Sequence, residues 1–350
     1  MATEAIDVFC HCMPSRYVEA VNESVAELPV MFQRAQRMPV MVDLAARLRV
    51  MDEFPGYRQI VSLPGPPVEV LALEHAAGLC QIANDALAGE VEASGGRLCG
   101  FAAALPMNDP AKACAEARRA VGNLGAVAAQ VYTSVGGKPL DDPQFEPVFQ
   151  TLGELDCPVL LHPTRSILMP DYPSESISKF DLWWAIGWPY ETTLAMARLA
   201  MSGLFERLPT IKVIAHHVGG YLPMLSGRLG PGMELLGTRN PPGAENLPQP
   251  QLAEPPAEAC RRFYADTASF GSRGAIECGL EFFGAERLLF ATDMPFDPQQ
   301  GPCYIRSTLA AIDNMNLTES HRAAILAGNA RRLFKLPDDS SHSAERGRRS

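Results

Sequence analysis

The feature that most constrains the fold is an alternation of short apolar runs with stretches of helical spacing along most of the chain. Eight runs are typical of buried strands. The predicted strands are 6–10, 59–63, 98–104, 126–132, 158–161, 212–215, 263–265 and 288–291. The predicted helices are 42–54, 72–94, 110–121, 143–155, 191–205, 274–283, 305–311 and 319–326. This alternation favours an α/β fold with a closed parallel barrel, the (β/α)8 or TIM-like barrel.

An open, doubly wound sheet is the alternative, but no glycine-rich phosphate turn follows Cys10 at the end of the first strand. We expect one barrel domain over residues 1–336. Four segments depart from the alternation. They are a long loop from 13 to about 40, an aromatic insertion at about 164–190, a proline-rich loop at about 238–257, and a polar tail at 337–350 that we expect to be disordered.

Four of the predicted strands end in a histidine or an aspartate, and these residues carry the functional signal. They are His11, His162, the pair His216 and His217, and Asp293. Catalytic groups of such barrels lie at the carboxyl ends of the strands. A buried carboxylate needs a metal ion or a histidine to compensate its charge. Neutral imidazole and carboxylate are standard zinc ligands, so the pattern predicts a shared metal site.

The residues alone leave alternatives open. His11 can equally be a structural histidine bonded to a backbone carbonyl. Neighbours on a strand alternate sides, so we expect only one of His216 and His217 to face the site, and the pattern does not choose between them. The same alternation turns the thiols of Cys10 and Cys12 away from His11, which favours buried apolar thiols over a thiolate metal site.

Composition excludes several other classes of protein. The formal net charge of −10 argues against nucleic acid as the main partner, because phosphates need a basic surface. There is no apolar window long enough for a membrane span and no secretory signal at the N-terminus. Nine cysteines without paired spacing indicate reduced thiols, so we expect a cytoplasmic protein.

Several motifs, in order, carry a family resemblance. They are Ile6-Asp7 with His11 and Pro14, Arg47 with Met51-Asp52, Leu160-Leu161-His162-Pro163, Trp184 with Pro189-Tyr190-Glu191-Thr192, Ser202 to Pro209, Ala215-His216-His217-Val218-Gly219-Gly220 with Pro223, Asp266-Thr267, and Thr292 to Phe296. On these motifs the chain resembles, over about residues 5–336, the amidohydrolase-related family that includes aminocarboxymuconate-semialdehyde decarboxylase and the metal-dependent aromatic acid decarboxylases. The resemblance implies an amidohydrolase-type barrel.

The resemblance also implies roles for the residues at the strand ends. His11, His162 and Asp293 match metal ligands, and Asp293 would also carry a proton. The spacing to Gly219-Gly220 places His217 at the family's catalytic histidine. The remaining matches are Trp184 at the mouth of the site, Arg37 or Arg34 for a substrate carboxylate, and His216 and Glu191 in supporting positions. The chain departs from the family at Phe9, which stands where the first ligand usually does and would face the substrate.

The implied activity is non-oxidative decarboxylation of a small aromatic or unsaturated carboxylic acid, with a divalent metal, zinc or else manganese, as Lewis acid. The alternative is a metal-dependent hydrolase or hydratase acting on an ester, lactone, amide or activated double bond. A metal-free relative that binds an acidic metabolite is a third hypothesis, because Phe9 cannot bind an ion. The aromatic and proline-rich loops also suggest a homo-oligomer, a dimer or a tetramer.

Overall fold

The strands form one parallel sheet that closes on itself. The computed structural model describes residues 3–233, 235, 239–243 and 252–337. The sheet has eight strands in the order β1-β2-β3-β4-β7-β8-β9-β10. Their bounds are β1 Ala5–His11, β2 Tyr57–Ser62, β3 Leu98–Ala104, β4 Ala128–Tyr132, β7 Val159–His162, β8 Val213–Ala215, β9 Tyr264–Asp266 and β10 Leu288–Leu289. The amide of Val8 donates to the carbonyl of Phe290 (3.0 Å) and that of His11 to Met294 (2.8 Å), which joins the first and last strands.

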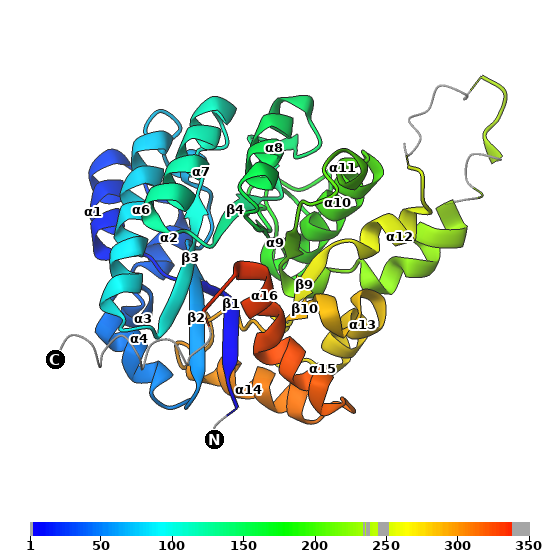
Figure 1. The fold of residues 1–350 in the computed structure, drawn as a ribbon. Helices are drawn as coiled ribbons and strands as arrows, with labels where there is room; N and C mark the ends of the chain where they lie inside the picture. Colours follow the sequence, from blue (N-terminus) through cyan, green and yellow to red (C-terminus); the bar gives the residue numbers. More distant parts are fainter. Residues whose placement is uncertain (1–2, 234, 236–238, 244–251, 338–350) are drawn as a thin grey trace.

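Helices surround this barrel and connect its strands (Figure 1). In the first half they are α1 Ser15–Ser24, α2 Val30–Ala35, α3 Pro39–Val42, α4 Leu44–Met51, α5 Val68–Leu71, α6 Ala76–Ala93, α7 Pro110–Leu124 and α8 Glu146–Glu154. In the second half they are α9 Leu182–Ala185, α10 Gly187–Met201, α11 Leu204–Arg207, α12 Pro256–Arg261, α13 Arg273–Phe283, α14 Pro302–Asp313, α15 Glu319–Ala323 and α16 Asn329–Phe334. A small hairpin, β5 Ser134–Val135 with β6 Lys138–Pro139, follows β4.

Two apolar layers hold the barrel together, as the alternation of side chains along a strand requires. Ile60, Leu160 and Ile214 point inward and fill the barrel with small residues from β3 and β4. The intervening positions, among them Val61 and Leu161, pack outward against the helices. α16 contributes Leu333 and Phe334 to the inner cluster and, in red in Figure 1, covers one end of the barrel. The other end, at the carboxyl ends of the strands, is left for polar side chains.

The eight predicted strands are confirmed, with ends that differ by at most two residues. The loop expected from 13 to about 40 is wrong, because this segment contains α1, α2 and α3. α2 and α3 have only six and four residues, too few to show a helical period, whereas the ten residues of α1 have an amphipathic spacing that the expected loop overlooked. The predicted insertion at 164–190 has no helix or strand before α9. Residues 238 and 244–251 of the predicted excursion at 238–257, and the tail after 337, lie outside the described residues.

Across the described ranges, no helix combines the length and the apolar character needed to cross a membrane.

Candidate functional site

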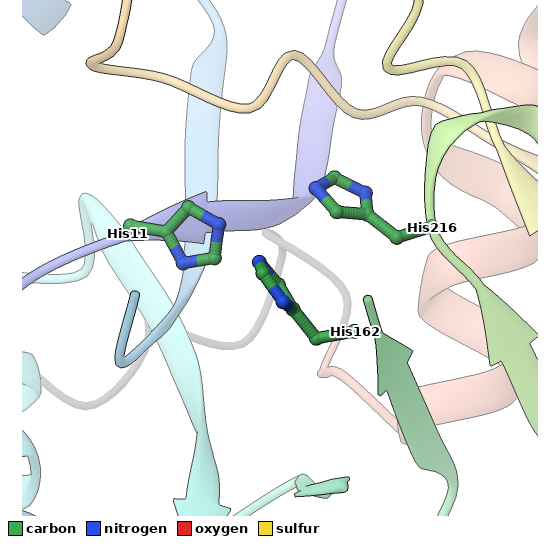
Figure 2. Close-up of side chains that lie close together, drawn as sticks. All are labelled: His11, His162 and His216. Carbon is green, nitrogen blue, oxygen red and sulfur yellow. The ribbon is translucent and has the colours of Figure 1, made fainter. Parts of the chain in front are cut away.

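The strand-end histidines meet at the carboxyl end of the barrel. Residues two apart on a strand share a face, so His162 follows the inward side chain of Leu160, and His216 follows that of Ile214. Figure 2 shows His11, His162 and His216 reaching into the same space from three different strands. The side chains of all three histidines are buried. The predicted gathering of strand-end side chains is therefore present.

A register shift in β1 between Asp7 and Cys10 sets the direction of the first of these histidines. Phe9, within the bulge, lies in the barrel interior, and Cys10, after it, lies in the outer layer, as expected for the thiol. The buried guanidinium of Arg47 donates to the carbonyl oxygen of His11 and to Oε1 of Gln59 (2.7 Å). These hydrogen bonds of Arg47 fix the end of β1, a positioning role that the sequence did not reveal.

The rings form two overlapping groups with the spacing of metal ligands. One ligand atom each from His11, His162 and His216 lie within 4.8 Å of one another, and the same holds for His216, His217 and Asp293. The ring centroids of His11 and His162 are 5.1 Å apart, and those of His162 and His216 are 5.4 Å apart. Asp293 thus belongs to the second group only, whereas His216 belongs to both.

The outer nitrogens of the three buried rings are all held by oxygen acceptors. Nδ1 of His11 lies 3.1 Å from the carbonyl oxygen of Leu63, and Nδ1 of His162 lies 2.6 Å from that of Pro163. Nδ1 of His216 bonds the carboxylate of Asp266. Because these oxygens only accept, each Nδ1 carries the hydrogen and each Nε2 is turned to the shared space. This is how metal-ligating histidines are usually held, so the donor set fits a divalent ion.

Asp293 lies at the centre of the second group. Its Oδ1 is 3.1 Å from Nε2 of His11, without hydrogen-bond alignment, and 3.4 Å from Nε2 of His216. Its Oδ2 is 3.5 Å from Nε2 of His217. Burial raises the pKa of Asp293, but the contacts with the three histidines outweigh it and hold that pKa well below its usual range. The carboxylate is therefore ionised and ready to bind a cation.

His216 and His217 both reach Asp293, so the expectation that only one of them would face the site is wrong. β8 ends at Ala215, and the backbone of His217 turns to φ 55°, outside the extended region in which neighbours alternate sides. Burial lowers the pKa of His216, but Asp266 and Asp293 outweigh it and raise that pKa to about 9. Burial and the neighbouring His216 lower the pKa of His217. Without an ion the two adjacent rings thus differ in charge at neutral pH, and an ion bound to Nε2 of His216 would replace the proton there.

Asp266 is the main participant to which the sequence assigned no role. One carboxylate oxygen bonds His216, and the other accepts the amides of Val218 (3.1 Å) and Ala268 (3.0 Å). It ends β9, just as the histidines end their own strands. That position was the available signal, because a buried carboxylate after a strand needs a partner.

Aromatic rings line one side of the site. Trp188 lies edge-on to His162, with centroids 5.4 Å apart, and Trp183 packs behind it. Trp184 is stacked on Phe270 (6.0 Å), whose ring lies 5.9 Å from that of His217. Trp184 thus lies one ring away from the cluster. Phe270 in turn contacts Tyr304, with centroids 4.6 Å apart.

The remaining predicted residues lie farther from the histidines. Glu191 pairs with Arg165 (2.9 Å), whose carbonyl oxygen accepts the indole N–H of Trp188 (3.3 Å), so it supports the ring beside His162 indirectly. Arg34, on α2, and Arg37 are exposed. Among the described residues, neither guanidinium makes an ion pair or a hydrogen bond, and the structure does not bring them to the cluster.

Known proteins resemble this chain over nearly its whole length. A family model described as amidohydrolase matches residues 10–336. The gamma-resorcylate decarboxylase of Polaromonas sp. (strain JS666) is 33% identical over 302 residues, 83% of this chain and 86% of that protein. The 2-amino-3-carboxymuconate-6-semialdehyde decarboxylase of Dictyostelium discoideum is 29% identical over 64% of this chain and 58% of its own length. A dihydroxybenzoic acid decarboxylase from Polaromonas sp. JS666, solved with manganese and the inhibitor 2-nitroresorcinol, superposes with a TM-score of 0.76 at 27% identity, covering 97% of this chain and 98% of its own.

Proposed function

The chain belongs to the amidohydrolase family, and we propose that it is a metal-dependent, non-oxidative decarboxylase of a small aromatic or unsaturated carboxylic acid. The family resemblance seen in the sequence is confirmed. Both curated relatives described above are decarboxylases, which makes a carbon–carbon lyase the better assignment than the hydrolase or hydratase alternative. The observation in this structure that supports it is the gathering of one nitrogen each from His11, His162 and His216 within 4.8 Å of one another, beside a second such group that contains His216 and Asp293.

We propose that His11, His162 and Asp293 hold the ion. Two imidazoles and a carboxylate suit zinc, our first choice, and also manganese, which the dihydroxybenzoic acid decarboxylase contains. The ion supplies Lewis-acid polarisation of oxygen atoms on the substrate. The buried environment around it strengthens every charge interaction, because little water can screen the field. Phe9, whose side chain has no polar atom and is fully buried, helps to exclude water from this space.

His217 is the residue that we propose to move the proton. Its Nδ1 has no hydrogen-bond partner in the described structure, and its Nε2 contacts Asp293. Its lowered pKa makes the ring neutral at pH 7, so it can pass a proton between a water and the substrate. In the reaction a proton is added to the carbon that bears the carboxylate, and the bond to CO2 breaks with its electrons returning to that carbon. Asp293, whose pKa is held low, stays ionised, and its negative charge stabilises the positive charge that forms on His217 during this transfer.

The substrate is proposed to lie against the aromatic side of the site. A flat ring between Trp184 and Phe9 would have its carboxylate near the histidine cluster. Arg34 and Arg37 remain our candidates for binding a substrate carboxylate. Both belong to the connection between β1 and α4, which begins at the catalytic end of the barrel. Their exposed position means that α2 would have to approach the bound substrate for either to make contact.

A direct test is CO2 release from hydroxybenzoates and muconate-like acids by protein that has been stripped with a chelator and reloaded with Zn2+ or Mn2+. We expect release from at least one acid, with metal-loaded protein only. Hydrolysis of esters or lactones by the loaded protein, with no CO2 from any acid, would overturn the assignment.

We propose further that the protein functions as a homo-oligomer in the cytoplasm. The segment 164–190 leaves several apolar side chains exposed, including Leu168, Tyr172 and Phe180, and a second copy of the chain could cover them. The nine cysteines are all free, which suits a reducing compartment. Sedimentation equilibrium of the purified protein tests the first point, and a monomer at micromolar concentration would contradict it.

A further inference from the structure

We propose that His216 is itself a ligand of the divalent ion, so that three imidazoles, from His11, His162 and His216, bind it together with Asp293. This rests on the proposed function in one respect, that an ion binds at this end of the barrel. It goes beyond the ligand set that the sequence suggested, in which His216 only supported the site.

The positions of the three rings are those of ligands to one atom. One nitrogen from each of the three histidines falls within 4.8 Å of the others, a group that does not include Asp293. Figure 2 shows the three rings turned toward one another from β1, β7 and the end of β8. His216 also lies 3.4 Å from Asp293, so it links the imidazole group to the carboxylate. An ion that bound His11, His162 and Asp293 would therefore meet Nε2 of His216 as well.

The contacts behind His216 hold it as firmly as the other two rings. Asp266 bonds its Nδ1 and is fixed by the amides of Val218 and Ala268. A carboxylate behind a ligating imidazole sets its tautomer and raises its basicity. His217 lacks such support, because its Nδ1 has no partner in the described structure. The chain thus distinguishes a fixed histidine from an adaptable one at neighbouring positions.

The face of His216 is covered by an apolar ring. Phe9 lies parallel to it, with centroids 3.8 Å apart and an interplanar angle of 12°. The same phenyl ring lies 5.9 Å from His162 and 6.0 Å from His11. The side chain of Phe9 thus lies among the three histidines but has no atom that can bind the ion. It restricts the plane of His216, and the ligand atoms that remain are the three imidazole nitrogens and the carboxylate.

The unmodified protein provides the first test. X-ray absorption of the Zn2+-loaded protein counts the imidazoles around the ion by their multiple-scattering signal. We expect three, and a fit that requires two would overturn the proposal. The measurement needs neither substrate nor substitution, so it does not depend on whether a variant folds.

Matched variants provide the second test, with Zn2+ affinity measured by chelator competition. We expect His216→Ala to lower the affinity by about 100-fold or more, and Asp266→Asn, which contacts the site only through His216, by about 10- to 100-fold. The exposed His75→Ala serves as the control and should change it less than about threefold. Wild-type affinity in His216→Ala would contradict the proposal. Circular dichroism confirms that each variant is folded.

The two proposals fail separately. Three imidazoles around the ion without CO2 release from any acid would refute the decarboxylase assignment and leave the ligand set intact. Two imidazoles in a protein that releases CO2 would refute the ligand set and leave the activity intact.

Discussion

The phenyl ring of Phe9 lies flat on the imidazole of His216, with 3.8 Å between centroids and 12° between planes. Both side chains are fully buried, and they come from strands at different places in the sheet order. The contact therefore helps to close the catalytic end of the barrel and fixes the orientation of a proposed ligand. Phe9, which replaces the usual first ligand on the first strand, therefore positions the ring of His216 instead.

Replacing Phe9 with Leu tests this role. Leucine keeps the site apolar but cannot stack, so we expect a loss of about 1–2 kcal/mol in the free energy of unfolding. We also expect Zn2+ affinity to fall by about 10-fold, because the plane of His216 is no longer restricted. Urea denaturation of metal-free protein and chelator competition measure the two effects. Phe101→Leu, in the outer layer, is the control: it should lose similar stability and keep its affinity for Zn2+.

The proton-transfer role of His217 predicts a different pattern. His217→Asn should lower kcat by about 100-fold or more, because proton transfer by a positioned side chain contributes roughly that much. Metal content, measured by elemental analysis, should stay at the wild-type value, since His217 is not among the proposed ligands. The exposed His75→Asn is the control. A rate within threefold of wild type would exclude the role assigned to His217.

Much of the barrel could be predicted from the sequence because its signals are local. Each strand is a short apolar run bounded by glycine, proline or a polar residue, and the sequence shows these boundaries directly. The six-residue helix α2 and the four-residue helix α3 were missed because most of their stability comes from packing on the rest of the protein. Amphipathic spacing over so few turns is not distinguishable from a loop.

The site was only partly predictable, for a related reason. Five of its residues lie at the ends of four strands and were found from that pattern alone, but the choice between His216 and His217 was not. Val213, Ile214 and Ala215 are all apolar, as in any strand that is buried on both faces. The sequence therefore does not show which of these side chains, and so which of the two histidines, points into the barrel. The positive φ of His217, which brings both rings to Asp293, is a tertiary feature. Asp266 needed only the same rule that identified Asp293.

Trp184 offers a test of the proposed substrate position. Trp184→Leu removes one ring of the aromatic side, and an aromatic contact is worth about 0.5–1.5 kcal/mol, so KM should rise roughly two- to twelvefold. We expect kcat to change little, because Trp184 does not contact the histidine cluster directly. Phe180→Leu, at a side chain that is 89% exposed, is the control and should leave both constants unchanged. A fall in kcat at constant KM would place Trp184 in the chemistry instead.

Glu69 predicts a pH dependence that is separate from catalysis. Its side chain is buried beside Tyr132 and Cys80, and burial raises its pKa from 4.5 to about 7. Because the folded pKa lies above the unfolded one, the stabilisation is fully present below pH 4.5 and is lost as the pH rises through about 7. Glu69→Gln cannot ionise, so it avoids this loss. The free energy of unfolding of the variant minus that of wild type should therefore be up to about 3 kcal/mol larger at pH 8 than at pH 4.5.

Urea denaturation of both proteins at pH 4.5 and pH 8 measures this relative change. The exposed Glu74→Gln, from the same connection, is the control, because a solvated carboxylate keeps its charge at no cost in either state. At pH 8 the wild-type protein must carry a negative charge on Glu69. One oxygen of that carboxylate has no hydrogen-bond partner in the described structure, so the charge is poorly stabilised there. An offset between Glu69→Gln and wild type that is the same at both pH values would mean that the carboxyl is not desolvated in solution, because only a shifted pKa makes the difference depend on pH.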